Sequence, residues 1–328
     1  MTRHGKTMKL RVLPVLIAAV LTPLVPTACN SGDSTGPTTL VWSSVQSGTT
    51  ARLTSIWGSS ATDIWVVGYN TILHYNGTTW STVSIPGTGT TQFLQGVWGS
   101  SAADVWAVGY ETTNHTPTVL HYDGVSWSSL ASGGTQLLTG VGGTSPSDLW
   151  IAGYNLMLHY DGAIWSSEPS AVYESWEGVW ASSASDVWAV TVRGGIVHYD
   201  GTGWSGISGG WNTLYGVWGR SAADVWAVGA SNTILHSNGS SWTTLLTTGS
   251  VTTNFFGVWG SSPSDVWFVS STGTNGPGDG MIHYYNGATL SNAMSATTPG
   301  LYGIWGSSAS DVWAVGDGGT IIHGSPAR

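Results

Sequence analysis

Hydrophobic and polar residues recur along the chain in one pattern. It reads L-x-G-V-W-G-S-S-A-x-D-V-W-A-V-G, then a short gap, then I-L-H-Y-D-G-x-x-W. Within each copy the apolar runs predict four strands, which we name a to d. In the second copy they cover residues 96–99, 105–109, 119–122 and the surroundings of Trp127. Strands b and c are apolar on both sides, as expected for a sheet that lies between two others.

The pattern occurs seven times, with its aspartates spaced by 38 to 46 residues. Such a period favours a β-propeller, because a four-stranded sheet cannot bury both faces alone. The last copy has no strand d after His323, whereas residues 40–44 match strand d and precede the first copy. We therefore expect an all-β, seven-bladed β-propeller over residues 39–328. In it, an N-terminal strand completes the last blade and closes the ring, which leaves no open sheet edge.

The N-terminus predicts export and a lipid anchor. Four basic residues precede an apolar stretch, residues 12–25, that is too short and too interrupted by Pro14 and Pro23 to span a bilayer. Cys29, the only cysteine, follows Pro-Thr-Ala in a sequence that resembles a lipobox. We interpret residues 1–28 as a lipoprotein signal peptide, Cys29 as the lipidation site and residues 29–38 as a flexible tether. The expected location is the bacterial envelope, in the periplasm or at the cell surface.

Charge narrows the possible partners. The chain has 8 Lys and Arg against 17 Asp and Glu, and every lysine lies within residues 1–28. Nucleic acid is therefore not an expected partner, because phosphate binding needs clustered cations. In up-and-down blades the d–a and b–c loops emerge on one face, and the a–b and c–d turns on the other. Arg52 and Arg193 fall on the first face and Arg220 on the second, so no arginine cluster of the sialidase kind is expected.

The repeated polar residues are predicted to be structural. The aspartates at the end of the a–b turns can hydrogen-bond their own backbone, and each strand-c histidine is expected opposite the strand-b tryptophan. A metal site is not expected, since the histidines point into different blade interfaces, and no cofactor is expected either. These structural residues are Asp63, Asp104, Asp148, Asp186, Asp224, Asp265 and Asp311 with His74, His121, His159, His198, His236, His283 and His323. The run 275–280 offers one carboxylate, too few for Ca²⁺.

The repeats resemble those of bacterial propellers described as tectonin-like or BNR (Asp-box)-like, over nearly all of residues 39–323. The resemblance rests on the V-W strand, the I-x-H-Y-D-G strand and the tryptophan that follows. It implies glycan binding at loops, as in lectins. The Asp-box pattern itself differs, because here Asn76 or an aspartate directly precedes glycine. A looser likeness to the quinoprotein-type repeats of outer-membrane assembly propellers implies an assembly scaffold.

A binding site is predicted on the face of the d–a and b–c loops, because these loops vary in length and chemistry while the a–b and c–d turns are nearly identical. Neighbouring loops there carry Tyr173, Glu174, Arg193 and Trp211, the one tryptophan outside every repeat position. The sequence thus predicts a membrane-anchored, non-catalytic binding propeller whose partner is a glycan or an envelope protein. The alternatives are an envelope assembly scaffold and an Asp-box-type glycoside hydrolase.

Overall fold

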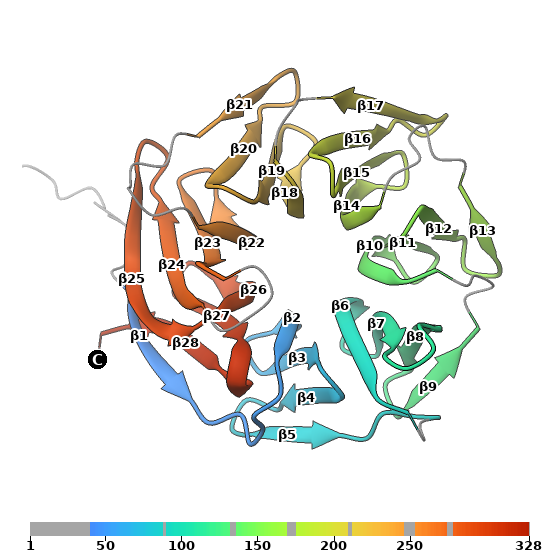
Figure 1. Ribbon diagram of the computed structural model, residues 1–328, viewed down its shortest axis with the longest axis horizontal. Helices are drawn as coiled ribbons and strands as arrows, with labels where there is room; N and C mark the ends of the chain where they lie inside the picture. The colour runs from blue at the N-terminus through green and yellow to red at the C-terminus, as the bar shows by residue number, and fades with distance from the viewer. Residues whose placement is uncertain are drawn as a thin grey trace, which may run out of the picture. The chain divides into compact units, whose positions relative to one another are not determined.

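The described part of the chain forms seven four-stranded antiparallel sheets around a central channel (Figure 1). The computed structural model describes residues 40–87, 90–131, 136–168, 175–208, 212–245, 253–273 and 278–327. The predicted all-β, seven-bladed propeller is therefore confirmed. Within these ranges, no helix is long and apolar enough to cross a membrane.

Each blade runs from strand a beside the channel to strand d at the rim. Blade one comprises β2 (Leu53–Ser60), β3 (Asp63–Gly68), β4 (Thr71–Tyr75) and β5 (Trp80–Val83). Blade two comprises β6 (Gln92–Ser101), β7 (Asp104–Glu111), β8 (Pro117–Tyr122) and β9 (Trp127–Leu130). Blade three comprises β10 (Leu138–Ser145), β11 (Asp148–Gly153), β12 (Leu156–Tyr160) and β13 (Trp165–Ser167). Blade four comprises β14 (Trp176–Ser183), β15 (Asp186–Thr191), β16 (Gly195–Tyr199) and β17 (Trp204–Ser208).

The remaining blades follow the same order. Blade five comprises β18 (Leu214–Ser221), β19 (Asp224–Gly229), β20 (Thr233–Ser237) and β21 (Trp242–Thr244). Blade six comprises β22 (Asn254–Ser262), β23 (Asp265–Ser271), β24 (Asp279–Tyr285) and β25 (Leu290–Pro299). Blade seven comprises β26 (Leu301–Ser308), β27 (Asp311–Gly316), the short 3-10 turn η1 (Asp317–Gly319), β28 (Ile321–Pro326) and finally β1 (Leu40–Val45).

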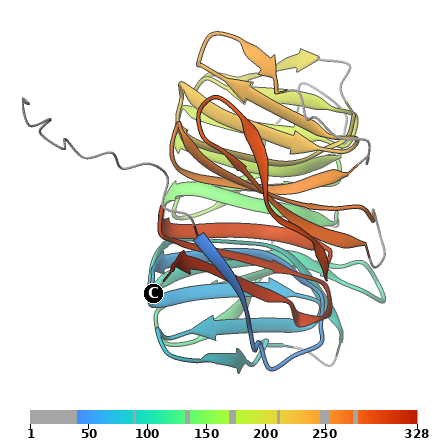
Figure 2. The same ribbon diagram turned by 90° about the vertical axis from the view of Figure 1, so that its left-hand side faces the viewer.

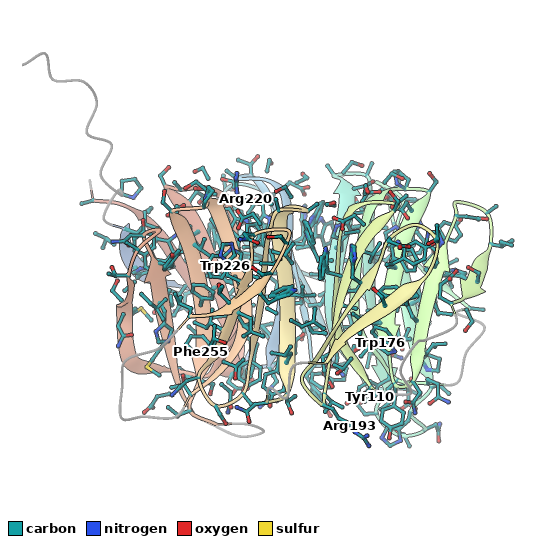
Figure 3. The ribbon with its side chains drawn as sticks, turned by 90° about the horizontal axis from the view of Figure 1, so that it is seen from above. Tyr110, Trp176, Arg193, Arg220, Trp226 and Phe255 are labelled. Atoms are coloured by element: carbon teal, nitrogen blue, oxygen red, sulfur yellow. The ribbon has the colours of Figure 1, made fainter. Side chains whose placement is uncertain are left out.

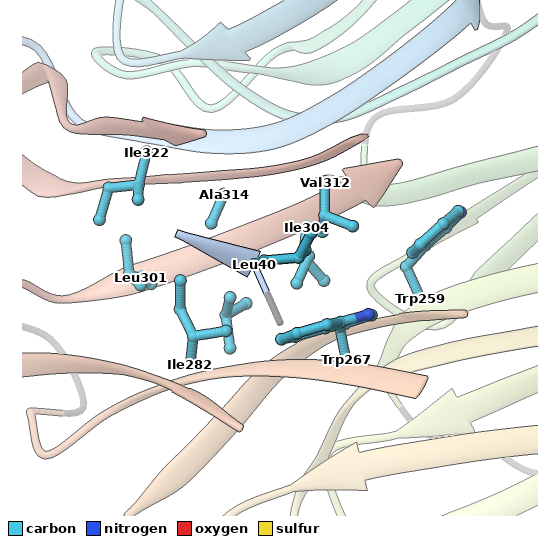
Figure 4. Close-up of a cluster of buried hydrophobic side chains, with 10 residues drawn as sticks. Leu40, Trp259, Trp267, Ile282, Leu301, Ile304, Val312, Ala314 and Ile322 are labelled. Carbon is cyan, nitrogen blue, oxygen red and sulfur yellow. The ribbon is translucent and has the colours of Figure 1, made fainter. Parts of the chain in front are cut away.

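The ring closes where β1 joins the C-terminal strands (Figure 2). β1 pairs with β28 over its whole length, from Leu40 opposite Pro326 to Val45 opposite Ile321. Leu40 lies in the hydrophobic cluster between blades six and seven (Figure 4). The Trp42 ring packs edge-to-face on Trp267 of blade six, with 5.3 Å between the ring centres. The N-terminal strand thus serves as strand d of the last blade, as the sequence predicts.

The aspartate that starts each strand b is the centre of a polar cluster. In blade two, Asp104 Oδ1 accepts hydrogen bonds from Trp106 Nε1 at 3.0 Å and pairs with His121 Nε2 at 2.7 Å, while Ser100 donates to Oδ2 at 2.5 Å. The His121 ring also stacks on the Trp106 ring at 4.1 Å. Six blades show this aspartate–histidine pair, at 2.6 to 2.9 Å. A buried carboxylate with three donors is well satisfied, which ties strands a, b and c together.

Blade six departs from this arrangement, and the predicted position of His283 opposite the strand-b tryptophan is wrong. In the first five copies one residue separates this histidine from the Asn or Asp of the c–d turn, whereas in blade six two tyrosines do, so His283 stands one residue further from the turn. Tyr284, not His283, lies opposite Trp267. His283 instead lies opposite Phe268 and hydrogen-bonds Ser270 at 2.9 Å. Burial lowers the pKa of His283 to about 4, against a smaller raising effect of its hydrogen bond with Asn292, so this histidine is neutral at neutral pH.

Strand a contains two β-bulges in every blade. The second bulge falls on the residue after W-G, normally Ser or Thr, and this residue is the one that bonds the aspartate of its own blade, as Ser59 bonds Asp63. The first bulge falls on residue x of the L-x-G part of the motif, near the start of strand a, where the side chain lines the channel. A bulge leaves one residue unpaired and redirects its side chain, so both positions are freed from the ladder for other contacts.

At five of the seven blade junctions, a tryptophan of strand a covers a glycine of the next blade. The Trp57 ring covers Gly99 of blade two so closely that a Cβ there would lie 2.6 Å from the ring. Trp98 covers Gly143 and Trp180 covers Gly219 in the same way. Blade three has Gly142 in place of the tryptophan, and the next blade has Ala181 in place of the covered glycine. Alanine thus replaces glycine in blade four, where the preceding blade has no tryptophan to cover this position.

Candidate functional site

The two faces of the ring carry different residues. Arg193, from a b–c turn, and Tyr110, near the end of β7, point to one face and Arg220 points to the other (Figure 3). We call the first face, with Arg52, Tyr69, Tyr154 and Arg193, the variable face, and the second, with Val125 and Arg220, the regular face. The predicted sorting of loops between the faces agrees with the structure.

Of the predicted loop site, the structure describes Arg193. Arg193 is exposed in the turn between β15 and β16. Tyr173, Glu174 and Trp211 lie outside the described residues, as do Cys29, the tether and part of the run 275–280. Among the residues that are described, no group of three His, Cys, Asp or Glu could hold a metal ion.

Arg220, on the regular face, is held by a neighbouring carboxylate. It occupies the second bulge of blade five, and its Nε lies 3.0 Å from Asp224 Oδ2. It thus replaces the serine or threonine that bonds the aspartate in the other blades. Substitution of Arg220 is therefore expected to affect stability and is a poor control for binding.

The first bulges converge in the central channel. This channel is a cavity of ≈ 810 Å³ lined by strand a of all seven blades. The bulged residues line it near the variable face, because they are the second to fourth residues of strands that start there. We call them the bulge ring, which consists of Thr54, Gln95, Thr139, Glu177, Tyr215, Phe256 and Tyr302. The strand-a tryptophans line the channel three residues further along.

Two threonines of the bulge ring serve the fold. Thr54 donates to the carbonyl oxygens of Val67 at 3.0 Å and Leu94 at 2.7 Å. The Thr139 hydroxyl contacts the carbonyl oxygens of Ala152 and Trp176 in the same way. Each threonine therefore joins its own blade to the next, which leaves the rest of the ring to give the channel its chemistry.

Blades five to seven contribute an aromatic arc. Tyr215 stacks on Phe256, with ring centres 4.8 Å apart and an interplanar angle of 25°. Phe256 meets Tyr302 edge-to-face at 5.0 Å. The guanidinium of Arg52 lies 4.8 Å from the centre of the Tyr302 ring, a cation–π contact. Asp317 completes this group, since its carboxylate accepts from Arg52 Nε at 2.6 Å and from the Tyr302 hydroxyl at 2.7 Å.

Glu177 brings an unusual acid into the channel. Burial raises its pKa to about 7, so at neutral pH the carboxyl is near its midpoint. Burial and the Glu177 charge together raise the pKa of the neighbouring Tyr215 hydroxyl, which stays neutral. Among the described residues, no hydrogen bond and no cationic side chain pairs with the Glu177 carboxylate.

Three tyrosines extend the site outward over blades one to three. Tyr69, Tyr110 and Tyr154 each follow the glycine that ends the V-G or A-G run of strand b. Tyr69 is 47% exposed and Tyr154 is 52% exposed. Phe93, which also lines the channel, lies between Tyr69 at 6.1 Å and Tyr110 at 5.7 Å. Exposed aromatics beside a cavity are typical of binding surfaces.

Comparison with known proteins supports the fold and no more. The chain is similar to a structure described as YCF48 bound to D1 peptide, with a TM-score of 0.69, 17% identity, and coverage of 87% of this chain and 97% of that chain. It is also similar to YCF48 from Cyanidioschyzon merolae, with a TM-score of 0.65, 14% identity, and coverage of 87% of this chain and 98% of that chain. The extracellular domain of BT4673 from B. thetaiotaomicron is similar with a TM-score of 0.64 and 12% identity, and the match covers 87% of this chain and 39% of that chain. No family model and no curated protein matches the sequence. The chain is a seven-bladed β-propeller similar in fold to these three structures.

Proposed function

We propose that the chain is a membrane-anchored, non-catalytic propeller of the bacterial envelope that binds a protein segment at the mouth of its channel on the variable face. The observation that carries this proposal is the bulge ring. Seven copies of one motif place seven residues at the same channel position, and these residues differ in size, charge and polarity. The residues of the regular face repeat almost unchanged.

Chemistry at the mouth supports a binding role. Aromatic side chains give large contact areas at low entropic cost, and they are enriched where proteins meet. Here the outer tyrosines and the aromatic arc surround an opening that holds the acid Glu177 and the ion pair of Arg52 with Asp317. That YCF48, a propeller of similar fold, is described with a bound D1 peptide favours a protein ligand over a glycan. Binding of a glycan, which the tectonin-like resemblance implies, would appear as a signal on a glycan array.

Replacement of an outer tyrosine tests the location of the site. Tyr69→Ser is expected to weaken partner binding by about tenfold, since an exposed aromatic at an interface contributes roughly 1–2 kcal/mol. Val125→Ser, on the regular face, is the matched control because Val125 is 86% exposed. The measurement is capture of cross-linked envelope proteins by the whole chain and by each variant. Equal loss with both variants, or loss with Val125→Ser alone, would contradict the proposal.

The lipid anchor is tested separately. A chain with Cys29 is expected to incorporate a fatty-acid analogue during growth and to fractionate with membranes. Cys29→Ala should abolish labelling, because the thiol is the only acyl acceptor of this kind in the chain. Equal labelling of both proteins would remove the anchor from the proposal and leave the binding face unaffected.

A further inference from the structure

We propose that Glu177, Tyr215 and Phe256 form a pocket in the channel for one cationic side chain, a lysine or an arginine, of the bound protein. This inference rests on the proposed function and adds the chemistry that the channel recognises. Glu177 lies on β14 and Tyr215 on the adjacent β18, and both are bulged residues that line the same cavity.

The protein itself contains an arrangement of the same kind. On the other side of the aromatic arc, a guanidinium lies over an aromatic ring while a carboxylate holds it in place, as Arg52, Tyr302 and Asp317 show. Glu177 with the stacked pair Tyr215 and Phe256 repeats two of these three parts, the carboxylate and the aromatic face. In the described chain, no cationic side chain of the protein supplies the third part.

Electrostatics favours a cation over other ligands. A carboxylate that is partly removed from water and has no counter-ion is unfavourable, and a ligand cation would offset that cost. An anion would be repelled, and a neutral apolar group would leave the acid unpaired. Aromatic rings add an attraction for ammonium and guanidinium groups that increases as water is excluded. The pocket is therefore suited to a basic side chain with an apolar stem.

The charges around Glu177 leave this acid as the group that controls binding. β10 contributes the uncharged Thr139, and β18 contributes Tyr215, which is neutral. The charges of Arg52 and Asp317, across the channel, offset each other. Arg193, in the turn after β15, is exposed. Because the pKa of Glu177 is about 7, its carboxylate is mostly protonated at pH 6 and mostly ionised at pH 8.

The test uses nine-residue Gly/Ser peptides with one central arginine, lysine or citrulline, titrated into the whole chain. Citrulline has the shape of arginine without its charge. At pH 8 the arginine and lysine peptides are expected to bind at least about tenfold more tightly than the citrulline peptide. At pH 6 the arginine peptide should lose about tenfold in affinity, as the ionised fraction of Glu177 falls from about nine-tenths to one-tenth.

Variants then assign the effect to Glu177. Glu177→Gln should bring the arginine peptide to the affinity of the citrulline peptide and remove the dependence on pH. Asp279→Asn, which changes an exposed acid of blade six outside the channel lining, should behave as the unchanged chain. A thermal melt of Glu177→Gln checks that the fold is intact. The inference is overturned if no peptide binds, if arginine and citrulline bind equally, or if Glu177→Gln binds as before. Loss of partner capture in Tyr69→Ser alongside these results would leave the proposed function standing without this pocket.

Discussion

A chain without residues 40–45 is expected to melt far below the intact protein or to aggregate. Deletion of β1 exposes the edge of β28 and removes Leu40 and Trp42 from the interface with blade six. Leu40 is 8% exposed, and the loss of two such apolar side chains costs on the order of 5 kcal/mol. That loss is comparable to the total stability of many domains.

Differential scanning calorimetry or fluorescence-monitored melting measures this effect. Val41→Ser keeps the strand and changes only a side chain that is 53% exposed, so its melting temperature should match that of the intact chain. Trp42→Ala should fall between the two, because the backbone pairing remains. A deletion variant with an unchanged melting temperature would mean that β1 does not close the ring in solution.

The second large effect is expected from Asp104→Ala. The substitution leaves the indole of Trp106, the imidazole of His121 and the hydroxyl of Ser100 without their common acceptor. Unpaired polar groups in a mostly buried site are each unfavourable, and together they should lower the free energy of unfolding by about 2–4 kcal/mol. Chemical denaturation measures this loss.

A second aspartate of the same blade is the matched control. Asp123 lies in the exposed c–d turn, where its carboxylate accepts the backbone N–H groups of Val125 and Ser126. Asn76 makes the same bonds in blade one, so Asp123→Asn should change stability by less than about 0.5 kcal/mol. Equal losses from both substitutions would show that charge in general, and not the polar cluster, determines the stability.

The sequence predicts the ring, its closure and most strand pairings because these depend on spacing and on periodic apolar residues. Leu40 and Trp42 matched strand d by residue type alone, and His121 was correctly expected opposite Trp106. For His283 the same reasoning failed, because blade six has Tyr284 at the position opposite the tryptophan and its histidine stands one residue further from the c–d turn.

The bulge ring was missed for a different reason. A bulge is a feature of the pairing between two strands, and nothing in strand a alone shows that the residue x is unpaired. The signal was nevertheless present, since x varies between copies more than the apolar residue before it, which is leucine in five of the seven. Glu177 and Tyr215 were therefore not among the predicted site residues, which lie in loops and include Tyr173, Glu174 and Trp211.

Blade three has Gly142 in place of tryptophan and blade four has Ala181 in place of glycine, and this paired change limits which blades can be exchanged or duplicated. Because the tryptophan of one blade covers the glycine of the next, blades three and four are matched to each other and not to the common pattern. A copy of blade two placed before blade four would bring a tryptophan onto a methyl group. Duplication, exchange or recombination of repeats is therefore best made in units that keep a blade with its successor.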